Sequence, residues 1–268
     1  MTAVALTVAG SDPSGGAGLQ ADLKTFERHD VYGCAVVTLI TVQNTRGVMR
    51  VVPLDAELVG AQLDAVLDDI PPRAWKTGAL GSRAIVEVIA ARAARLAPTG
   101  VSLVVDPVMI SKHGASLIDD AARDALVHAL LPHCALVTPN LHEAAALTGQ
   151  RVTTLAEARD AARAIAALGP RAVLVKGGHL DGAPVDVLFA DGALHELRGE
   201  RIETRHTHGT GCTLSAAITA RLARGELLLD ACLAAKRWLA QALRTAPGLG
   251  AGVGPVNHHV DPRTLEHA

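Results

Sequence analysis

The chain has 268 residues, of which 49% are hydrophobic, and this is enough to bury a large core, so residues 1–268 are predicted to form one domain. The formal net charge is -2 and only 2% of the residues are aromatic. Because this composition supplies neither a basic field nor a stacking surface for bases, we expect neither nucleic acid nor an anionic membrane as a partner.

Short β-branched segments alternate with Ala- and Leu-rich segments of helical periodicity, which is typical of a parallel α/β sheet. The predicted strands cover residues 4–8, 35–42, 74–78, 101–106, 135–140 and 172–178. The predicted helices cover residues 17–29, 55–68, 82–96, 119–131, 141–148 and 154–168. Strands this uniformly apolar are expected where helices cover both faces of the sheet.

The pattern changes between residues 184 and 204, where short alternating segments surround an Asp-Gly turn signal. We expect an antiparallel hairpin and edge strands in this part of the chain. Two closing helices are predicted near residues 210–223 and 226–245, followed by a glycine-rich tail.

The cysteines and the first residues indicate a cytoplasmic protein. The four cysteines show no CxxC spacing, and the apolar opening MTAVALTVAG lacks the basic segment of a signal peptide. We therefore expect reduced thiols and a buried first strand. No apolar segment of the sequence is long enough to span a bilayer.

The first predicted strand leads into AGSDPSGGAGLQADLKTF (9–26), a loop rich in small residues that opens a helix. Small residues let the backbone approach a ligand, and a helix N-terminus holds negative or polar groups. The loop has neither the order of a Rossmann fingerprint nor the Gly-Lys-Ser/Thr of a Walker A loop. The alternative is a tight turn with no ligand.

Polar side chains follow three other predicted strands. Asp106 ends one strand, Asn140 and Glu143 follow a second, and Lys176 lies at the end of a third. Ligands of open α/β sheets bind at this edge, and two acids with an amide can hold a hydrated Mg²⁺ beside phosphate oxygens. The alternatives are helix-capping roles for the acids and a surface position for the lysine.

The segment HGTGCTLSAAI begins a predicted helix with a Gly-Thr-Gly triplet and a cysteine. The amides of Gly209, Thr210, Gly211 and Cys212 should converge where the helix dipole favours an anion, and glycines permit the backbone angles of such a nest. A cysteine at this position should have a lowered pKa. The alternative is a small residue that fills space behind the loop.

Together these motifs resemble the bacterial hydroxymethylpyrimidine/phosphomethylpyrimidine kinases of thiamine biosynthesis, which belong to the ribokinase-like superfamily. The resemblance covers nearly the whole chain and rests on AGSDPSGGAGLQADLKTF, QNTRGV, KTGAL, DPVM, TPNLHEA, KGGHL and THGTGCTLSAAI. It implies a three-layer sandwich, with a mostly parallel central sheet, helices on both faces and a small antiparallel edge. It also implies a homodimer that uses ATP and Mg²⁺ to phosphorylate 4-amino-5-hydroxymethyl-2-methylpyrimidine and then its monophosphate.

The resemblance assigns roles to individual residues. The pyrimidine would be bound by Gly10, Asp22, Gln43, Ala79 and Val108. A carboxylate or carboxamide suits an aminopyrimidine edge, which offers a donor beside an acceptor. ATP would contact Lys176, Thr207, Gly209, Gly211 and Asn140, and Mg²⁺ would be positioned by Asp106 and Glu143 with Asn140. The catalytic group would comprise Cys212, Lys176, Gly209, Thr210 and Gly211.

Cys212 stands where most ribokinase-like enzymes carry an aspartate, and it is similar to the cysteine of the pyrimidine kinases. Phosphoryl transfer depends mostly on positioning and charge stabilisation, so a base need only accept the proton of the attacking hydroxyl. Our hypothesis is therefore that Cys212 acts as a general base and not as a covalent nucleophile.

Two residues depart from the pattern of the family, and the role of one segment is left open. Ala79 stands where many members have a methionine lining the pyrimidine pocket, and His206 replaces an expected asparagine. Residues 110–118 are small and polar after Met109 and could form a flap over the phosphates.

Two other functions compete with the pyrimidine kinase. A pyridoxal or pyridoxine kinase of the same superfamily is favoured by Ala79 but disfavoured by Gln43 and Asp22. The second competitor is a pyrimidine-binding sensor without catalysis. A binder of a neutral pyrimidine has no need for phosphate-transfer groups, so the joint presence of such groups argues against a sensor: Asp106, Glu143, Lys176 and Cys212.

Overall fold

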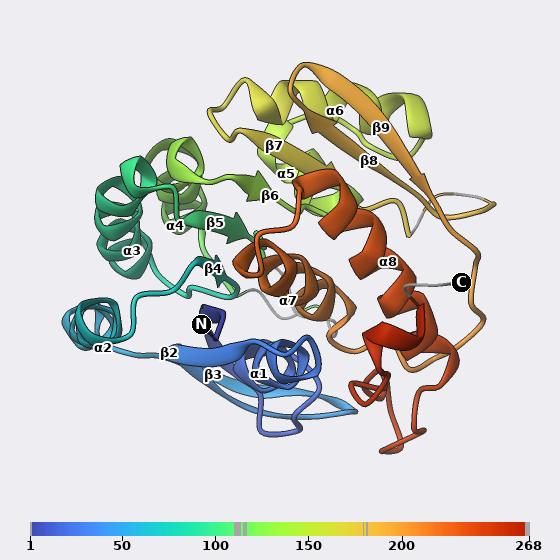
Figure 1. Cartoon of the computed structure of the whole chain (residues 1–268), viewed down its shortest axis with the longest axis horizontal. Helices are drawn as coiled ribbons and strands as arrows, with labels where there is room; N and C mark the ends of the chain where they lie inside the picture. The colour runs from blue at the N-terminus through green and yellow to red at the C-terminus, as the bar shows by residue number, and fades with distance from the viewer. Residues whose placement is uncertain (1, 110–113, 115–116, 179, 181, 266–268) are drawn as a thin grey trace.

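The computed structural model describes residues 2–109, 114, 117–178, 180 and 182–265, and it shows one continuous sheet between two layers of helices (Figure 1). The strands are β1 (Val4–Ser11), β2 (Tyr32–Asn44), β3 (Gly47–Pro53), β4 (Ala74–Thr77), β5 (Ser102–Val105), β6 (Leu136–Val137), β7 (Ala172–Val175), β8 (Val185–Ala190) and β9 (Ala193–Arg198).

The α-helices are α1 (Gly18–Arg28), α2 (Ala56–Asp69), α3 (Arg83–Leu96), α4 (Asp120–Ala125), α5 (Leu141–Thr148), α6 (Leu155–Ala166), α7 (Thr210–Ala223) and α8 (Leu228–Arg244). The helix predicted over 119–131 is irregular, because α4 passes into a π turn over Leu126–Leu130 and a 3-10 turn over Leu131–His133. Pro132 lies in the last turn and has no N–H to continue an α-helix. Among the described residues, no helix combines the length and apolar character needed to cross a bilayer.

The sheet is parallel at its centre and antiparallel at both edges. The strand order is β3-β2-β1-β4-β5-β6-β7-β8-β9. β8 and β9 form the predicted antiparallel edge. The sequence analysis did not anticipate β3, which pairs antiparallel with a β2 that continues to Asn44. The turn residues Thr45 and Arg46 separate the two strands without the Asn-Gly or Asp-Gly pair that marks most short hairpins.

Alternating side chains of the central strands supply two separate hydrophobic layers. Leu6 and Trp75 pack with α2 to α6 on one face, whereas Ala5 and Ala74 pack with α1 and α7 on the other. Helix α8 joins α7 on the second face, as Figure 1 shows. The side-chain period of two along each strand therefore produces the predicted arrangement of helices on both faces.

His29 follows the last turn of α1 and lies inside the second layer. Its ring has no exposed surface and meets Trp238 edge to face, with ring centroids 4.8 Å apart. Nδ1 lies 2.9 Å from the carbonyl oxygen of Thr25. Burial lowers the pKa of His29 to about 4, although the bond to Thr25 opposes this shift. The native protein therefore keeps His29 neutral where an unfolded chain would protonate it.

This burial predicts a loss of stability in acid. The unfolded chain binds a proton at His29 below about pH 6.5, whereas the native chain does so only near pH 4, so stability falls between these values. At pH 5 the effect of one such histidine is about 2 kcal/mol. In urea titrations at pH 7.5 and pH 5, His29→Gln should lose less stability on acidification than the wild type. His128→Gln, at an exposed position, should behave like the wild type, and equal losses in all three proteins would contradict the prediction.

Candidate active site

A cavity of about 1310 Å³ opens at the carboxyl ends of the central strands. Apart from Asp22, every residue that the sequence analysis placed at the site contributes to its wall. These residues are Gly10, Gln43, Ala79, Asp106, Val108, Asn140, Glu143, Lys176, Thr207, Gly209, Thr210, Gly211 and Cys212. Segments far apart in the sequence therefore meet in one cavity, as expected for the carboxyl edge of a parallel sheet.

The Gly-Thr-Gly triplet forms the start of α7, as predicted. Gly209 is the N-cap residue and has a left-handed backbone with φ 78°. A Cβ atom on Gly209 would lie 1.8 Å from the carbonyl oxygen of Gly16, so only glycine fits. A Cβ atom on Gly211 would lie 3.2 Å from Lys176 Nζ. The first-turn amides of α7 therefore open beside a lysine, which is a favourable arrangement for phosphate oxygens.

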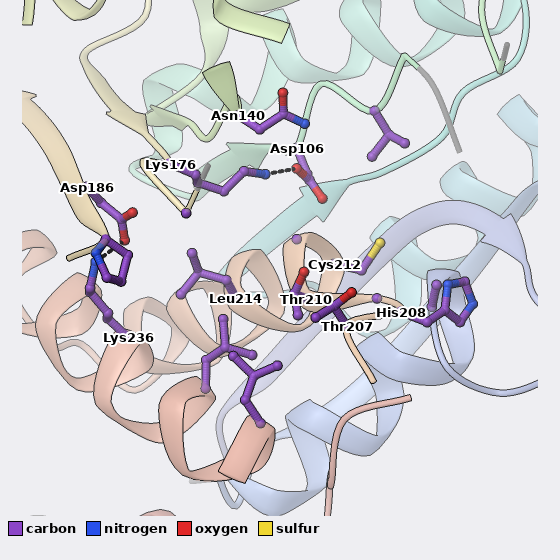
Figure 2. Close-up of a pocket in the computed structure, with 18 of the residues that line it drawn as sticks. Asp106, Asn140, Lys176, Asp186, Thr207, His208, Thr210, Cys212, Leu214 and Lys236 are labelled. Carbon is purple, nitrogen blue, oxygen red and sulfur yellow. Dashed lines mark hydrogen bonds and ion pairs between the residues drawn. The ribbon is translucent and has the colours of Figure 1, made fainter. Parts of the chain in front are cut away.

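Lys176 lies between two carboxylates near the middle of the cavity, and Figure 2 shows its ammonium group beside one of them, Asp106. Its Nζ is 3.0 Å from Asp106 Oδ1 and 3.9 Å from Glu143 Oε2. Burial alone would lower the pKa of Lys176, but the two carboxylates raise it above its ordinary value, so the lysine remains charged. Burial raises the pKa of Glu143 to about 7, against the opposing effect of Lys176 and with a contribution from Asp106. Two acids thus share one ammonium group.

Glu143 also has the capping role that the sequence left as an alternative, and its partner is Asn140. The side-chain oxygen of Asn140 accepts from Glu143 N at 2.9 Å, and Glu143 Oε2 accepts from Asn140 N at 2.7 Å. This capping box begins α5 and fixes both side chains beside Lys176. The structural and functional interpretations of these two residues are therefore compatible.

Cys212 lies half-buried in the first turn of α7 and lines the cavity between Lys176 and His208 (Figure 2). The expectation of a lowered pKa is wrong for this structure. Burial raises the pKa of the Cys212 thiol to about 12, and Asp106 and Asp22 add to this shift, whereas Lys76 opposes it. The loss of water around the sulfur outweighs the influence of the helix N-terminus, so the protein alone holds a neutral thiol.

The expectation that Asp22 binds the pyrimidine is also wrong for this structure. Its carboxylate has no exposed surface, does not line the cavity and lies 2.8 Å from Lys76 Nζ through each oxygen. Thr7 Oγ1 donates to the same carboxylate at 2.6 Å. Lys76 is equally buried, on β4 directly beside Thr7 of β1. Asp22 is therefore the counter-ion of a buried lysine behind the cavity wall, and a direct contact with a pyrimidine is not available to it.

Sequence reasoning missed other polar groups of the cavity. At one end, Lys236 Nζ lies 2.7 Å from Asp186 Oδ2, while Asp186 Oδ1 accepts from Gly177 N at 2.8 Å. At the other end, His208 contacts Asp12. Figure 2 shows these two ends on opposite sides of Lys176 and Cys212. Asp186 is a charged residue within the apolar segment VDVLFA, and this unusual position could have indicated the Asp186–Lys236 pair from the sequence.

The flap that the sequence suggested over 110–118 falls mostly outside the described residues, which include only 114, 117 and 118 of that range. Leu117 N donates to Met109 O at 2.9 Å, and both residues line the cavity.

Comparison with known proteins identifies the family. The family model described as phosphomethylpyrimidine kinase matches residues 12–257. The chain belongs to this family. It is 52% identical over 262 residues to a hydroxymethylpyrimidine/phosphomethylpyrimidine kinase of Rhizobium meliloti, covering 96% of this chain and 97% of that protein. A protein of the same name from Streptomyces coelicolor is 47% identical over 253 residues, covering 94% and 93% of the two chains.

Solved structures confirm the predicted ribokinase-like fold of this family member. The pyridoxal kinase of Staphylococcus aureus in complex with AMP-PCP and pyridoxal superimposes with a TM-score of 0.87 at 35% identity, over 96% of this chain and 94% of that one. A phosphomethylpyrimidine kinase from Clostridium difficile gives a TM-score of 0.78 at 41% identity, over 90% and 99% of the two chains.

The buried ion pair predicts a marked asymmetry between single and double variants. Lys76→Met leaves the buried carboxyl group of Asp22 without its counter-ion, so the free energy of unfolding should fall by about 3–5 kcal/mol in urea titrations. The double variant Lys76→Met/Asp22→Asn removes both charges and should be more stable than Lys76→Met alone. Arg83→Met breaks the exposed Arg83–Glu87 pair and should cost less than about 1 kcal/mol. A double variant as unstable as the single one would contradict the ion-pair interpretation.

Proposed function

We propose that the protein transfers the γ-phosphoryl group of ATP to the hydroxymethyl group of 4-amino-5-hydroxymethyl-2-methylpyrimidine, and then phosphorylates the resulting monophosphate to the pyrophosphate. The proposal rests on one observation: in a member of the phosphomethylpyrimidine kinase family, a single cavity contains both the charged residues suited to phosphate and the predicted pyrimidine-binding residues. A charged cradle of Lys176 and the α7 amides lies at its centre, and Gln43, Ala79 and Val108 line the pyrimidine side.

Gln43 is positioned to recognise the aminopyrimidine. Gln43 helps to lower the pKa of Asp12, whose carboxylate has only acceptor atoms, so the amide NH₂ of Gln43 is the end that suits this neighbour. This leaves the carbonyl oxygen of Gln43 for the exocyclic amine of the substrate. Gly10 lies at the end of β1 in the same wall, and a Cβ atom there would be 2.5 Å from Leu39 Cδ1.

ATP would place its phosphates at Lys176 and at the amides of Gly209 and Gly211, with Thr207 and Asn140 alongside. The AMP-PCP complex of the Staphylococcus aureus relative supports a nucleotide in this fold. The nucleoside would extend toward Asp186 and Lys236, where apolar residues of α8 line the cavity. Because Lys176 remains charged, it can stabilise negative charge on the transferred phosphoryl group.

The oxygen ligands at the cradle fit Mg²⁺. Asp106 and Glu143 together carry more negative charge than Lys176 balances, and a hydrated Mg²⁺ needs only one or two carboxylates beside phosphate oxygens. When bound, the metal would neutralise phosphate charge. Asp106 and Glu143 would hold it, and the capping bond from Asn140 N would orient Glu143.

Cys212 would accept the proton of the substrate hydroxyl as its oxygen attacks the γ-phosphorus and the bond from phosphorus to ADP breaks. Because the resting thiol is neutral, this step requires the minor thiolate form, whose population Lys76 increases. Lys176 and the α7 amides would supply the greater part of the stabilisation by positioning and charge.

A homodimer and a cytoplasmic location complete the proposal. The outer face of the β2–β3 hairpin exposes Ile40, Val42 and Val52, and an exposed group of apolar side chains marks a surface suited to a second copy. All four cysteines are free, which supports a reducing compartment.

A side-by-side assay tests the substrate. Consumption of ATP in the presence of Mg²⁺ should be fastest with hydroxymethylpyrimidine and its monophosphate, and slower with pyridoxal. Faster turnover of pyridoxal, together with thermal stabilisation only by the pyridine, would instead support the pyridoxal kinase. Binding of the pyrimidine without any ATP consumption would support the sensor.

The raised pKa of Cys212 predicts an alkaline rise in turnover. Below a pKa of about 12 the thiolate fraction increases about tenfold per pH unit, so kcat should rise between pH 6.5 and 9 with both substrates saturating. Cys212→Asp carries an ionised base over this whole range and should show a flatter profile with part of the activity. Cys212→Ser should be slower than the wild type by about 100-fold or more at each pH. Near-normal turnover of Cys212→Ser would refute the base role.

The metal assignment predicts a change in magnesium dependence. Glu143→Gln should raise the Mg²⁺ concentration for half-maximal activity by about tenfold. The matched control is Glu157→Gln, because Glu157 forms the same capping box at the start of α6 with Thr154 and lies outside the cavity. Both variants keep an acceptor for the capping bond but lose its negative charge. An equal shift of the Mg²⁺ titration in both would therefore point to helix capping and not to the metal.

A further inference from the structure

Asp12 and His208 form a buried contact between two loops that are nearly 200 residues apart in the sequence. His208 Nε2 lies 2.8 Å from Asp12 Oδ2, and only 7% and 3% of the two side chains are exposed. Asp12 belongs to the loop between β1 and α1, which borders the pyrimidine side of the cavity. His208 immediately precedes Gly209, the N-cap residue of α7. One interaction therefore joins the substrate loop to the phosphate cradle.

The carboxylate of Asp12 organises its own loop at the same time. Oδ1 accepts from the backbone and hydroxyl of Ser14 at 2.8 and 2.7 Å, and Oδ2 accepts from the amides of Gly16 and Ala17 at 3.1 and 2.8 Å. Burial alone would raise the pKa of Asp12, but hydrogen bonds from His208, Ser14 and Gln43 hold it well below its usual value. The ionised carboxylate thus connects its own loop to the residue before the α7 N-cap.

The two loops also pack backbone against backbone. A Cβ atom on Gly16 would lie 2.6 Å from His208 Cδ2, and a Cβ atom on Gly209 would lie 1.8 Å from the carbonyl oxygen of Gly16. The amide of Gly18, at the start of α1, helps to lower the pKa of Cys212 against the effect of burial. Because Gly16 leaves no space between the loops for a side chain of its own, we expect a displacement of the 12–18 segment to shift residues 208–212.

We propose that the Asp12–His208 pair is a positioning element that couples the two halves of the cavity, so that a pyrimidine bound beside Gln43 and Asp12 orders the phosphate cradle and strengthens nucleotide binding. His208 acts through Gly209 and the α7 amides and makes no contact with the reacting atoms. Since binding energies are reciprocal, the nucleotide strengthens pyrimidine binding by the same factor. This inference rests on the proposed pyrimidine kinase function.

The test is a measurement of coupling between ligands. Titration calorimetry with AMP-PCP, with and without saturating hydroxymethylpyrimidine, should show tighter nucleotide binding in the presence of the pyrimidine, by about fivefold or more in the wild type. His208→Ala should reduce this factor to near one. His208→Gln keeps an N–H donor for Asp12 and should restore most of the coupling, which a purely space-filling role would not explain.

Hydrogen exchange gives a second readout that does not depend on the substrate. In the free protein, the amides of residues 12–17 and 209–212 should exchange faster in His208→Ala than in the wild type. His258→Ala is the matched control, because His258 is similarly buried and its Nε2 lies 3.1 Å from Thr213 Oγ1 on the same helix, but it does not join the two loops. His258→Ala should keep the coupling factor even where it lowers stability.

The outcomes separate this inference from the proposed function. Unchanged exchange in His208→Ala, or a wild-type coupling factor in that variant, overturns the positioning role. Loss of coupling in both His208→Ala and His258→Ala also overturns it, because a general loosening of α7 would then be the cause. If the wild type does not bind the pyrimidine, the proposed substrate fails and the coupling claim fails with it, while faster exchange in His208→Ala alone still supports the contact between the loops.

Discussion

The ammonium group of Lys76 lies in the interior of the sheet, where an unpaired charge would be strongly destabilising, and Asp22 is the group that makes this position tolerable. The pair fixes α1 to β4, and Thr7 of β1 shares the same carboxylate. The loop that begins at Asp12 ends where α1 starts, and α7 packs on both α1 and β4. The positions of the substrate loop and of the phosphate cradle therefore both depend on how α1 is held. The same lysine supplies positive charge behind Cys212.

Charge is distributed unevenly along the cavity, and this suits a phosphoryl transfer. The centre concentrates Lys176, Asp106 and Glu143 within ion-pair distance. The pyrimidine side has no comparable cluster of charges among its described lining residues. Asp12, on this side, is hydrogen-bonded to the amides of its own loop and to His208. In the proposed function, a neutral heterocycle and a polyphosphate would thus meet surfaces of matching character. The reacting hydroxyl would lie at the boundary between them, where Cys212 is found.

Periodicity predicted most of the fold, and the rule that ligands bind at the carboxyl edge of a parallel sheet brought Asp106, Asn140, Glu143, Lys176 and the start of α7 to one cavity. The predicted residues of the pyrimidine side came from the resemblance to the kinase family. The failures concern properties that arise only from contacts between distant segments. Asp22 lies in α1 close to the loop that precedes it, but its partner Lys76 lies on β4. The raised pKa of Cys212 results from burial in the folded site, and this burial cannot be predicted from a motif at the start of a helix. The pair of Asp12 and His208 spans almost the whole chain.

The β2–β3 hairpin has one face that lines the cavity and one that is exposed. Leu39, Thr41 and Gln43 line the cavity, whereas Ile40 and Val42 between them point outward and are about half exposed. Because adjacent residues of a strand face opposite sides, a single inserted or deleted residue in β2 would exchange the cavity wall with the outer surface. The residues that line the cavity and the residues that form the outer face therefore alternate along the same short segment of β2. Such a segment can change by substitution, one face at a time, but it cannot change in length without altering both faces together.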